Sequence, residues 1–160
     1  NPSTGQSEEA YQVNQSLTAI GSGGKMGRGE ESTQTKLNFL PEHHTDFIFS
    51  VVGEEFGFVG AALVLSLFAL MIWRALRILT MSKNFYGALV AGGITAMLMF
   101  QVFVNVGMTI GIMPITGIPL PLMSYGGSSV LTTFLAVGLL QSIYAQGRAI
   151  YGSKRRGPTI

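Results

Sequence analysis

Cysteine is absent from the 160 residues of this chain, and charged side chains make up only 11% of them. The lack of thiols excludes a disulfide framework and a thiolate metal site. An average soluble domain has about 25% charged residues, whereas 48% of this chain is hydrophobic. Such a composition predicts a membrane protein.

Motifs that would identify several other classes of protein are also missing. The sequence has no Walker-type phosphate loop, no dinucleotide fingerprint and no nucleophile elbow of a Ser-His-Asp enzyme. It has no basic stripe that would indicate a nucleic-acid partner. The chain opens at Asn1 with a polar segment, and no signal peptide precedes that segment. We therefore expect a fragment of a larger membrane protein.

Apolar segments predict three membrane spans. Residues 56–73 form an uncharged run of 18 residues, near the lower limit for a spanning helix. Residues 84–147 contain no Asp, Glu, Lys, Arg or His, and this stretch is too long for one spanning helix. Its middle holds residues that a continuous helix does not tolerate, namely Pro114, Pro119, Pro121, Gly117, Gly126 and Gly127. The sequence therefore predicts an all-α bundle with spans at 47–79, 85–110 and 128–147.

The segments between and around these spans are of three kinds. Residues 1–46 are polar and are expected to form an outer-face loop with a short amphipathic helix over Ala10–Ile20. Residues 111–127 are apolar but cannot be regular, and unpaired backbone groups cannot face lipid. This Pro/Gly loop should therefore fold against protein or line a cavity. Residues 148–160 form a basic tail.

The distribution of charge predicts the orientation in the membrane. All eight acids lie at or before residue 55, in the company of only three bases. The other seven bases lie after the uncharged run 56–73, either before the second span or in the tail after the third. The positive-inside rule makes the loop after the first span and the tail cytoplasmic. Residues 1–46 and the Pro/Gly loop then share the outer face.

The densest polar cluster is LPEHHTD at 40–46, directly before the first span. Asp46 can be interpreted in two ways. Either Thr45 or Asp46 caps the following helix, or Asp46 is a general base at the membrane surface. Adjacent His43 and His44 lack the i, i+4 spacing of a helical metal site and are expected to be a solvated loop pair.

Other polar and small residues have weaker interpretations. Glu54 and Glu55 lie in an apolar segment, where an ionisable side chain faces a cavity, a partner or the interface. Gln101 and Asn105 share a helical face and are expected to donate interhelical hydrogen bonds. Two small-xxx-small pairs, Gly53 with Gly57 and Gly107 with Gly111, predict close packing. The bases Lys25, Arg28 and Lys36 are either solvated or bind an anionic diphosphate.

Four blocks of sequence resemble a known family. QSLTAIGSGGKMGRG (15–29), TQTKLNFLPEHHTDFIFSVVGEEFGFVG (33–60), FVNVGMTIGIMPITGIPLPLMSYGGSS (103–129) and the closing apolar helix are similar to the RodA/FtsW/SpoVE family of shape, elongation, division and sporulation proteins. The segment TQT…FLPE resembles the RodA branch of the family more than the FtsW branch. The resemblance implies a ten-helix protein of the bacterial plasma membrane with cytoplasmic termini, of which this chain would be the last three to four helices.

The resemblance also implies an activity and its site. The family polymerises lipid II into glycan strands beside a class B penicillin-binding protein, and its essential acid in TDFIF falls on Asp46. That carboxylate would take the proton of the attacking sugar hydroxyl. Substrate contacts are expected from Lys25, Arg28, Lys36 and Glu42, and from a cavity wall that includes Ser124 and Ser128. A divalent cation is an alternative stabiliser of the leaving diphosphate.

Two other functions remain as alternatives. A lipid II flippase should line its spans with polar residues at depth, and the second and third spans offer chiefly Gln101 and Asn105. A non-catalytic scaffold of the wall-synthesis complex would leave Asp46 dispensable. The clustering of acids on the outer face favours surface chemistry on a substrate that has already been flipped.

Overall fold

A computed structural model describes residues 2–27, 46–82, 84–124 and 126–155. Within these ranges the chain forms four helices and no strand: α1 (Pro2–Ser22), α3 (Ile48–Met81), α4 (Phe85–Thr109) and α5 (Gly127–Arg155). Three stretches are long and apolar enough to cross a membrane: all of α3, all of α4, and Gly127–Gly147 of α5. The predicted all-α membrane fold is confirmed.

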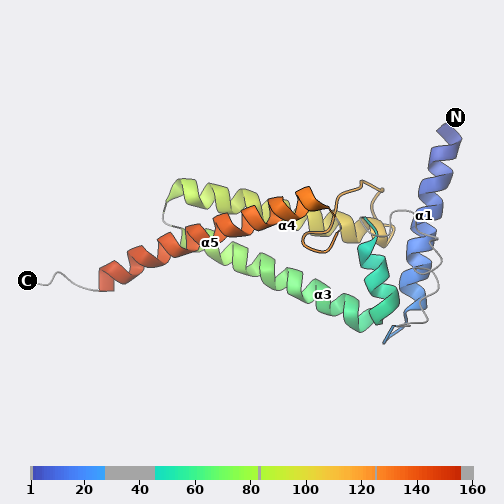
Figure 1. Ribbon diagram of the computed structural model, residues 1–160, viewed down its shortest axis with the longest axis horizontal. Coiled ribbons are helices and arrows are strands. Elements are labelled where there is room, and N and C mark those ends of the chain that lie inside the picture. Colours follow the sequence, from blue (N-terminus) through green and yellow to red (C-terminus); the bar gives the residue numbers. More distant parts are fainter. Residues whose placement is uncertain (1, 28–45, 83, 125, 156–160) are drawn as a thin grey trace, which may run out of the picture.

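Helix α3 is broken at Gly57, where the backbone angles are φ 64° and ψ −161°. A positive φ is accessible to glycine because glycine has no Cβ. The short part of α3, Ile48–Phe56, stands at a steep angle to the long part, Phe58–Met81 (Figure 1). At 1.5 Å per residue the long part extends about 36 Å, enough by itself to cross a hydrocarbon core of ~30 Å. The segment expected as one span at 47–79 therefore consists of two helical parts.

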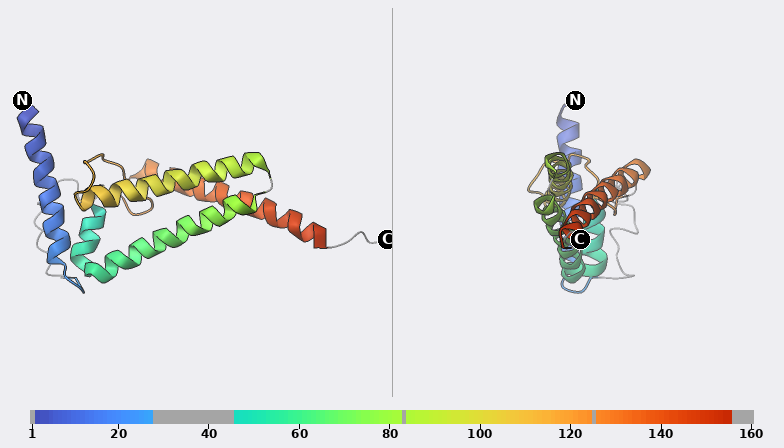
Figure 2. Two further views of the ribbon diagram at one scale, coloured as in Figure 1. Left: turned by 180° about the vertical axis from the view of Figure 1, so that it is seen from behind. Right: turned by 90° about the vertical axis from the view of Figure 1, so that its left-hand side faces the viewer.

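The long helices converge at one end and separate at the other. The long part of α3 and α4 meet at the turn around Asn84, and α5 crosses them and extends beyond that turn (Figures 1 and 2). Ala75, Ala91 and Leu140 form a buried cluster where the three helices meet. The two alanines allow the backbones of α3 and α4 to approach closely.

Most large apolar side chains of the spans are exposed. Phe58, Phe85 and Leu131 each expose 73% or more of their surface. A water-soluble protein rarely exposes contiguous apolar surface of this extent. Lipid, or other helices of the same protein, would cover such a surface, and the exposure is in keeping with a multi-pass membrane protein.

Helix α1 lies across the end of the bundle that is remote from the α3–α4 turn (Figure 2). It begins at Pro2 and is longer than the expected Ala10–Ile20 helix. Ser16 Oγ donates a 2.7 Å hydrogen bond to the carbonyl of Thr109 at the end of α4. The amphipathic segment expected on the outer face is thus attached to the last turn of α4.

Candidate active site

Asp46 lies half-buried just before α3. Phe47 occupies the N-cap position, and no side chain makes a capping bond there. Asp46 is therefore one residue outside the cap, and the structure does not support the interpretation of Asp46 as the N-cap residue. Thr45, the other candidate cap, lies outside the described residues.

Asn105 holds the backbone on which Asp46 is mounted. Its Nδ2 donates hydrogen bonds to the carbonyl of Asp46 at 2.9 Å and to the carbonyl of Ile118 at 2.8 Å. Because both neighbours are acceptors, they determine which end of the amide faces them. The Asn105 side chain is fully buried. One side chain of α4 thus joins the segment before α3 to the Pro/Gly loop. Asn105 is a donor, as expected, but both acceptors lie outside helices, so the bonds are not interhelical.

The Pro/Gly loop forms the wall beside the Asp46 carboxylate. A Cβ added at Gly117 would lie 3.4 Å from Asp46 Oδ2, and Gly117 has φ +65°. The loop is irregular, as predicted, and it folds against protein because Leu120 and Pro121 are buried. A side chain at position 117 would be strained by the backbone angle, and its Cβ would contact the carboxylate.

The two serines predicted as substrate contacts occupy different surroundings. Ser124 is buried, and its Oγ accepts a 2.7 Å hydrogen bond from the amide of Leu120. The amide of Ser124 in turn bonds the Leu120 carbonyl at 3.1 Å. Ser124 therefore closes a tight turn within the loop, while Ser128 is exposed on the first turn of α5.

A glycine-rich segment after α1 packs into the break of α3. The amides of Phe58 and Val59, released by the break, donate to the carbonyls of Gly24 at 2.9 Å and Lys25 at 3.3 Å. Any Cβ at Gly23, Gly27 or Gly57 would overlap backbone atoms of the facing segment. The predicted close packing of Gly57 is confirmed, and its partner is this segment rather than another span.

This packing also places Lys25. Its backbone lies at the break, and the short part of α3, about 13 Å long at 1.5 Å per residue, separates that break from Asp46. The Lys25 side chain is exposed. The described structure therefore does not bring Lys25 beside Asp46. Predictions for Arg28, Lys36, Glu42, His43 and His44 fall outside the described residues.

Glu54 and Glu55 differ in burial. Glu54 is fully buried in the short part of α3, whereas Glu55 is partly buried. A buried ionisable side chain in a membrane protein is costly and is retained where it faces a partner or a cavity. Among the described residues no group of three or more His, Asp or Glu side chains could hold a metal ion. The described residues therefore do not fit a divalent cation site.

Sequence reasoning missed two features of this site. The break at Gly57 was not predicted, although the small-residue pair signalled close packing. The partners of Asn105 were also missed. Residue 46 is 59 positions away in the sequence, and residue 118 lies in an irregular loop. One feature of the sequence could have indicated them: Asn105 and the Pro/Gly loop are both predicted to lie toward the same face of the membrane.

Fold and site together define an integral membrane protein in which the carboxylate of Asp46 lies at the end of a helical bundle, beside an irregular loop. Residues 1–149 match the model of the FtsW/RodA/SpoVE family, described as cell cycle proteins. The chain belongs to this family, as its sequence blocks predicted.

Similar proteins share this segment at high identity. The chain is 48% identical over 147 residues to peptidoglycan glycosyltransferase RodA of Treponema pallidum, covering 91% of this chain and 34% of that protein. It is 45% identical to peptidoglycan glycosyltransferase MrdB of Escherichia coli K12, covering 88% and 38%. It is 44% identical to stage V sporulation protein E of Bacillus subtilis, covering 86% and 38%. The chain thus spans little more than a third of the length of these relatives.

A solved structure has the same fold. It comes from work on how a peptidoglycan synthase complex coordinates polymerization and crosslinking, and it aligns with a TM-score of 0.69 at 34% identity. The alignment covers 84% of this chain and 37% of the solved chain. The arrangement of helices seen here is therefore that of a segment of a larger family member.

Proposed function

We propose that the full-length protein containing this chain is a peptidoglycan glycosyltransferase that polymerises lipid II, with Asp46 as its general base. The main observation in support of the proposal is the way in which Asp46 is held in place. Its backbone is held by Asn105, and its carboxylate lies against Gly117 of the irregular loop. The printed names of the relatives from Treponema pallidum and Escherichia coli support the reaction class.

The reaction requires one proton transfer to the protein. An acceptor sugar hydroxyl attacks the anomeric carbon of the donor, a carbon–oxygen bond forms, and the bond to the lipid diphosphate breaks. The hydroxyl proton passes to the carboxylate of Asp46, and the diphosphate leaves with the bonding electrons. Since a diphosphate leaves without being protonated, one carboxylate is sufficient, unlike the pair in glycosidases.

A carboxylate works as a base only if it is kept at a fixed distance from the hydroxyl. Asn105 restrains the Asp46 backbone, and the absence of a side chain at Gly117 leaves space beside Oδ2. Lys25, Arg28, Lys36 and Glu42 are proposed to contact the substrate, with Ser124 and Ser128 in the cavity wall. Among these residues, Lys25 lies at the break of α3 rather than beside Asp46.

The proposed setting is the bacterial plasma membrane, with Asp46 at the outer face and the C-terminus in the cytoplasm. The charge distribution supports this orientation, because seven of the ten Lys and Arg residues follow the uncharged run 56–73. We propose a class B penicillin-binding protein as the partner that cross-links the strands. The similarity to a chain from a peptidoglycan synthase complex supports an assembly of this kind.

Substitution of Asp46 in the full-length protein tests the proposal. The protein is purified with its penicillin-binding partner, the transpeptidase is blocked, and conversion of lipid II into polymer is measured. Asp46→Asn keeps the shape but removes the base, so we expect a loss of about 10²- to 10⁴-fold. Asp46→Glu retains a carboxylate and should keep part of the activity.

Two controls give the result its meaning. Each variant must bind the partner and unfold at the temperature of the unsubstituted protein. Normal polymerisation by a folded Asp46→Asn variant would refute the general-base assignment. The flippase or scaffold functions would then be the better explanations of the site.

A further inference from the structure

The end of the bundle opposite Asp46 is rich in positively charged residues. Seven Lys or Arg residues follow Glu55 in the sequence, and no Asp or Glu does. Arg74 and Arg77 stand one helical turn apart on the long part of α3, and both are exposed. Arg77 lies over the ring of Trp73, with 5.8 Å from Cζ to the ring centroid. An exposed tryptophan at this level is typical of a membrane interface.

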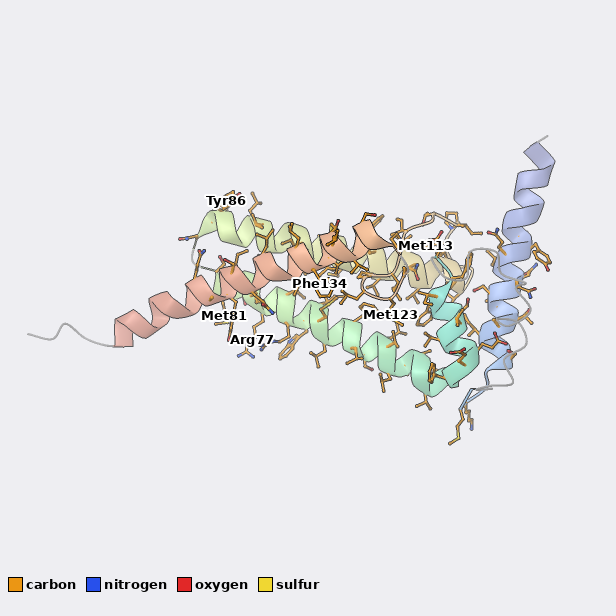
Figure 3. All side chains as sticks on the ribbon, in the orientation of Figure 1. Arg77, Met81, Tyr86, Met113, Met123 and Phe134 are labelled. Atoms are coloured by element: carbon orange, nitrogen blue, oxygen red, sulfur yellow. The ribbon has the colours of Figure 1, made fainter. Side chains whose placement is uncertain are left out.

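A groove between α3 and α5 opens at these arginines. Its mouth is a cavity of about 330 Å³ lined by Arg74, Arg77, Ile78, Met81 and Tyr144. Figure 3 shows Arg77 and Met81 near the crossing of α3 and α5. A second cavity of about 600 Å³ shares Arg74, Ile78 and Tyr144 with the mouth. The two cavities therefore adjoin at these three residues, and we refer to them together as the groove.

The groove becomes apolar with depth. Below Arg74 and Gln141 it is lined by Leu67, Leu70, Met71, Leu98, Val137 and Leu140. From Ile78 to Leu67 the groove follows eleven residues of α3, about 16 Å at 1.5 Å per residue. This length is about half of a ~30 Å hydrocarbon core. The groove thus extends from the interface to the middle of the bilayer, which is the depth of one leaflet.

We propose that this groove binds an anionic phospholipid of the leaflet opposite Asp46. The phosphate would contact the guanidinium groups of Arg74 and Arg77, and one acyl chain would lie in the apolar part between α3 and α5. In the proposed orientation this is the cytoplasmic leaflet, whose anionic lipids attract basic residues beside spanning helices. Basic pockets between spanning helices on that side bind such headgroups.

The headgroup, rather than the acyl chain, provides the selectivity. Lipid tails are as apolar as leucine, so moving a tail from the bilayer into the groove changes its surroundings little. The planar guanidinium group matches phosphate oxygens in a bidentate way and is the side chain best suited to this contact. A zwitterionic lipid also has a phosphate, but its positively charged ammonium group is repelled by the arginines.

Another helix of the full-length protein is the competing occupant of the groove. Such a helix would fill the apolar part, yet it would leave the two arginines without an anion unless it also carried an acid. Because the two cavities share lining residues, the cationic and apolar linings lie next to each other. This arrangement matches the headgroup and acyl chain of a lipid better than it matches a helix. The two occupants make different predictions for lipid retention.

Native mass spectrometry of the full-length protein in detergent tests the proposal. Phosphatidylglycerol and phosphatidylethanolamine are added in turn, and retention of each is measured. We expect preferential retention of phosphatidylglycerol, reduced roughly thirtyfold in the variant with both Arg74→Gln and Arg77→Gln. The matched control, Lys154→Gln with Arg155→Gln, removes the same charge from the tail and should retain the lipid.

A second variant probes the apolar part without changing charge. Val137→Trp fills the groove, and it should lower retention while both arginines remain. Equal retention of the two lipids, or unchanged retention after loss of the arginines, would overturn the proposal. A groove filled by another helix would give that result. Because the measurement does not involve polymerisation, its outcome is independent of the role of Asp46.

Discussion

At the end of the bundle that carries Asp46, the side chains of Ser16 and Asn105 bond backbone carbonyls of other segments. At the opposite end, Arg74 and Arg77 are exposed and line an open groove. The backbones differ in the same way. All residues with positive φ in the described part of the chain lie at the Asp46 end: Gly24, Gly27, Gly57, Gly111, Gly117 and Leu122.

This contrast indicates that the two ends meet their ligands differently. A reaction requires its groups to be positioned before the substrate arrives, so irregular backbone with buried hydrogen bonds is typical of a catalytic end. A lipid is present at high concentration and adapts its own shape, so an open groove with exposed cations is sufficient. The test variants below change the rigid end, and neither they nor their controls alter a residue that lines the groove.

The largest effect is expected at the break in α3. Gly57→Ala would place a Cβ against the backbone of Met26 and Gly27, at a residue whose φ is 64°. Backbone cannot move aside as a flexible side chain can, so we expect a loss of more than about 4 kcal/mol or a failure to fold. Thermal unfolding of the full-length protein in detergent measures the change.

Gly138→Ala is the matched control for this substitution. Gly138 lies inside α5 and has nothing within 4 Å of an added Cβ. Alanine favours a helix over glycine by about 0.5–1 kcal/mol, so this variant should be as stable as the unsubstituted protein or slightly more stable. Similar behaviour of the two variants would contradict the close packing of residues 23–27 on the break.

A smaller effect on stability and a larger one on activity are expected at Asn105. Asn105→Ala leaves the carbonyls of Asp46 and Ile118 without their buried donor. We expect a loss of about 1–3 kcal/mol in the free energy of unfolding. Because the Asp46 backbone is released, kcat for lipid II polymerisation should fall more than KM rises.

Ser66→Ala serves as the control for Asn105→Ala. The Ser66 hydroxyl is exposed and bonds only the Ala62 carbonyl of its own helix turn. Its removal should change the free energy of unfolding by less than about 0.5 kcal/mol and leave kcat unaltered. An equal fall in kcat for the two variants would show that Asn105 does not position Asp46.

Features that depend on neighbouring residues could be predicted from the sequence, whereas features that depend on contacts between distant residues were missed. The spans follow from long uncharged stretches, and the irregular loop follows from Pro114, Pro119 and Pro121, because these are properties of neighbouring residues. The break at Gly57 depends on carbonyls of Gly24 and Lys25. No local pattern contains that information, since an isolated glycine in an apolar segment is equally typical of simple helix packing.

The same limit applied to the candidate site. Asp46 stood out because it joins a polar cluster to an apolar helix, and the resemblance to a family selected it. Its support could not be predicted, because the bonds of Asn105 join positions 59 and 13 residues apart. The burial of Glu54 beside exposed Phe56 was equally invisible, since it depends on the segment that packs on the short part of α3.

The smallest effect is expected at Leu122, the one non-glycine residue with positive φ in the described chain, at 64°. A left-handed backbone costs an L-residue with a Cβ roughly 1–2 kcal/mol, and Leu122 is 45% exposed, so its side chain contributes only partly to packing. Leu122→Asn should therefore raise the unfolding temperature slightly, because asparagine adopts this conformation more readily. Leu122→Ile should lower it, because a β-branched side chain adopts the conformation poorly. Opposite signs would confirm that strain is stored in the loop beside Asp46, whereas a fall in both variants would show that leucine packing outweighs it.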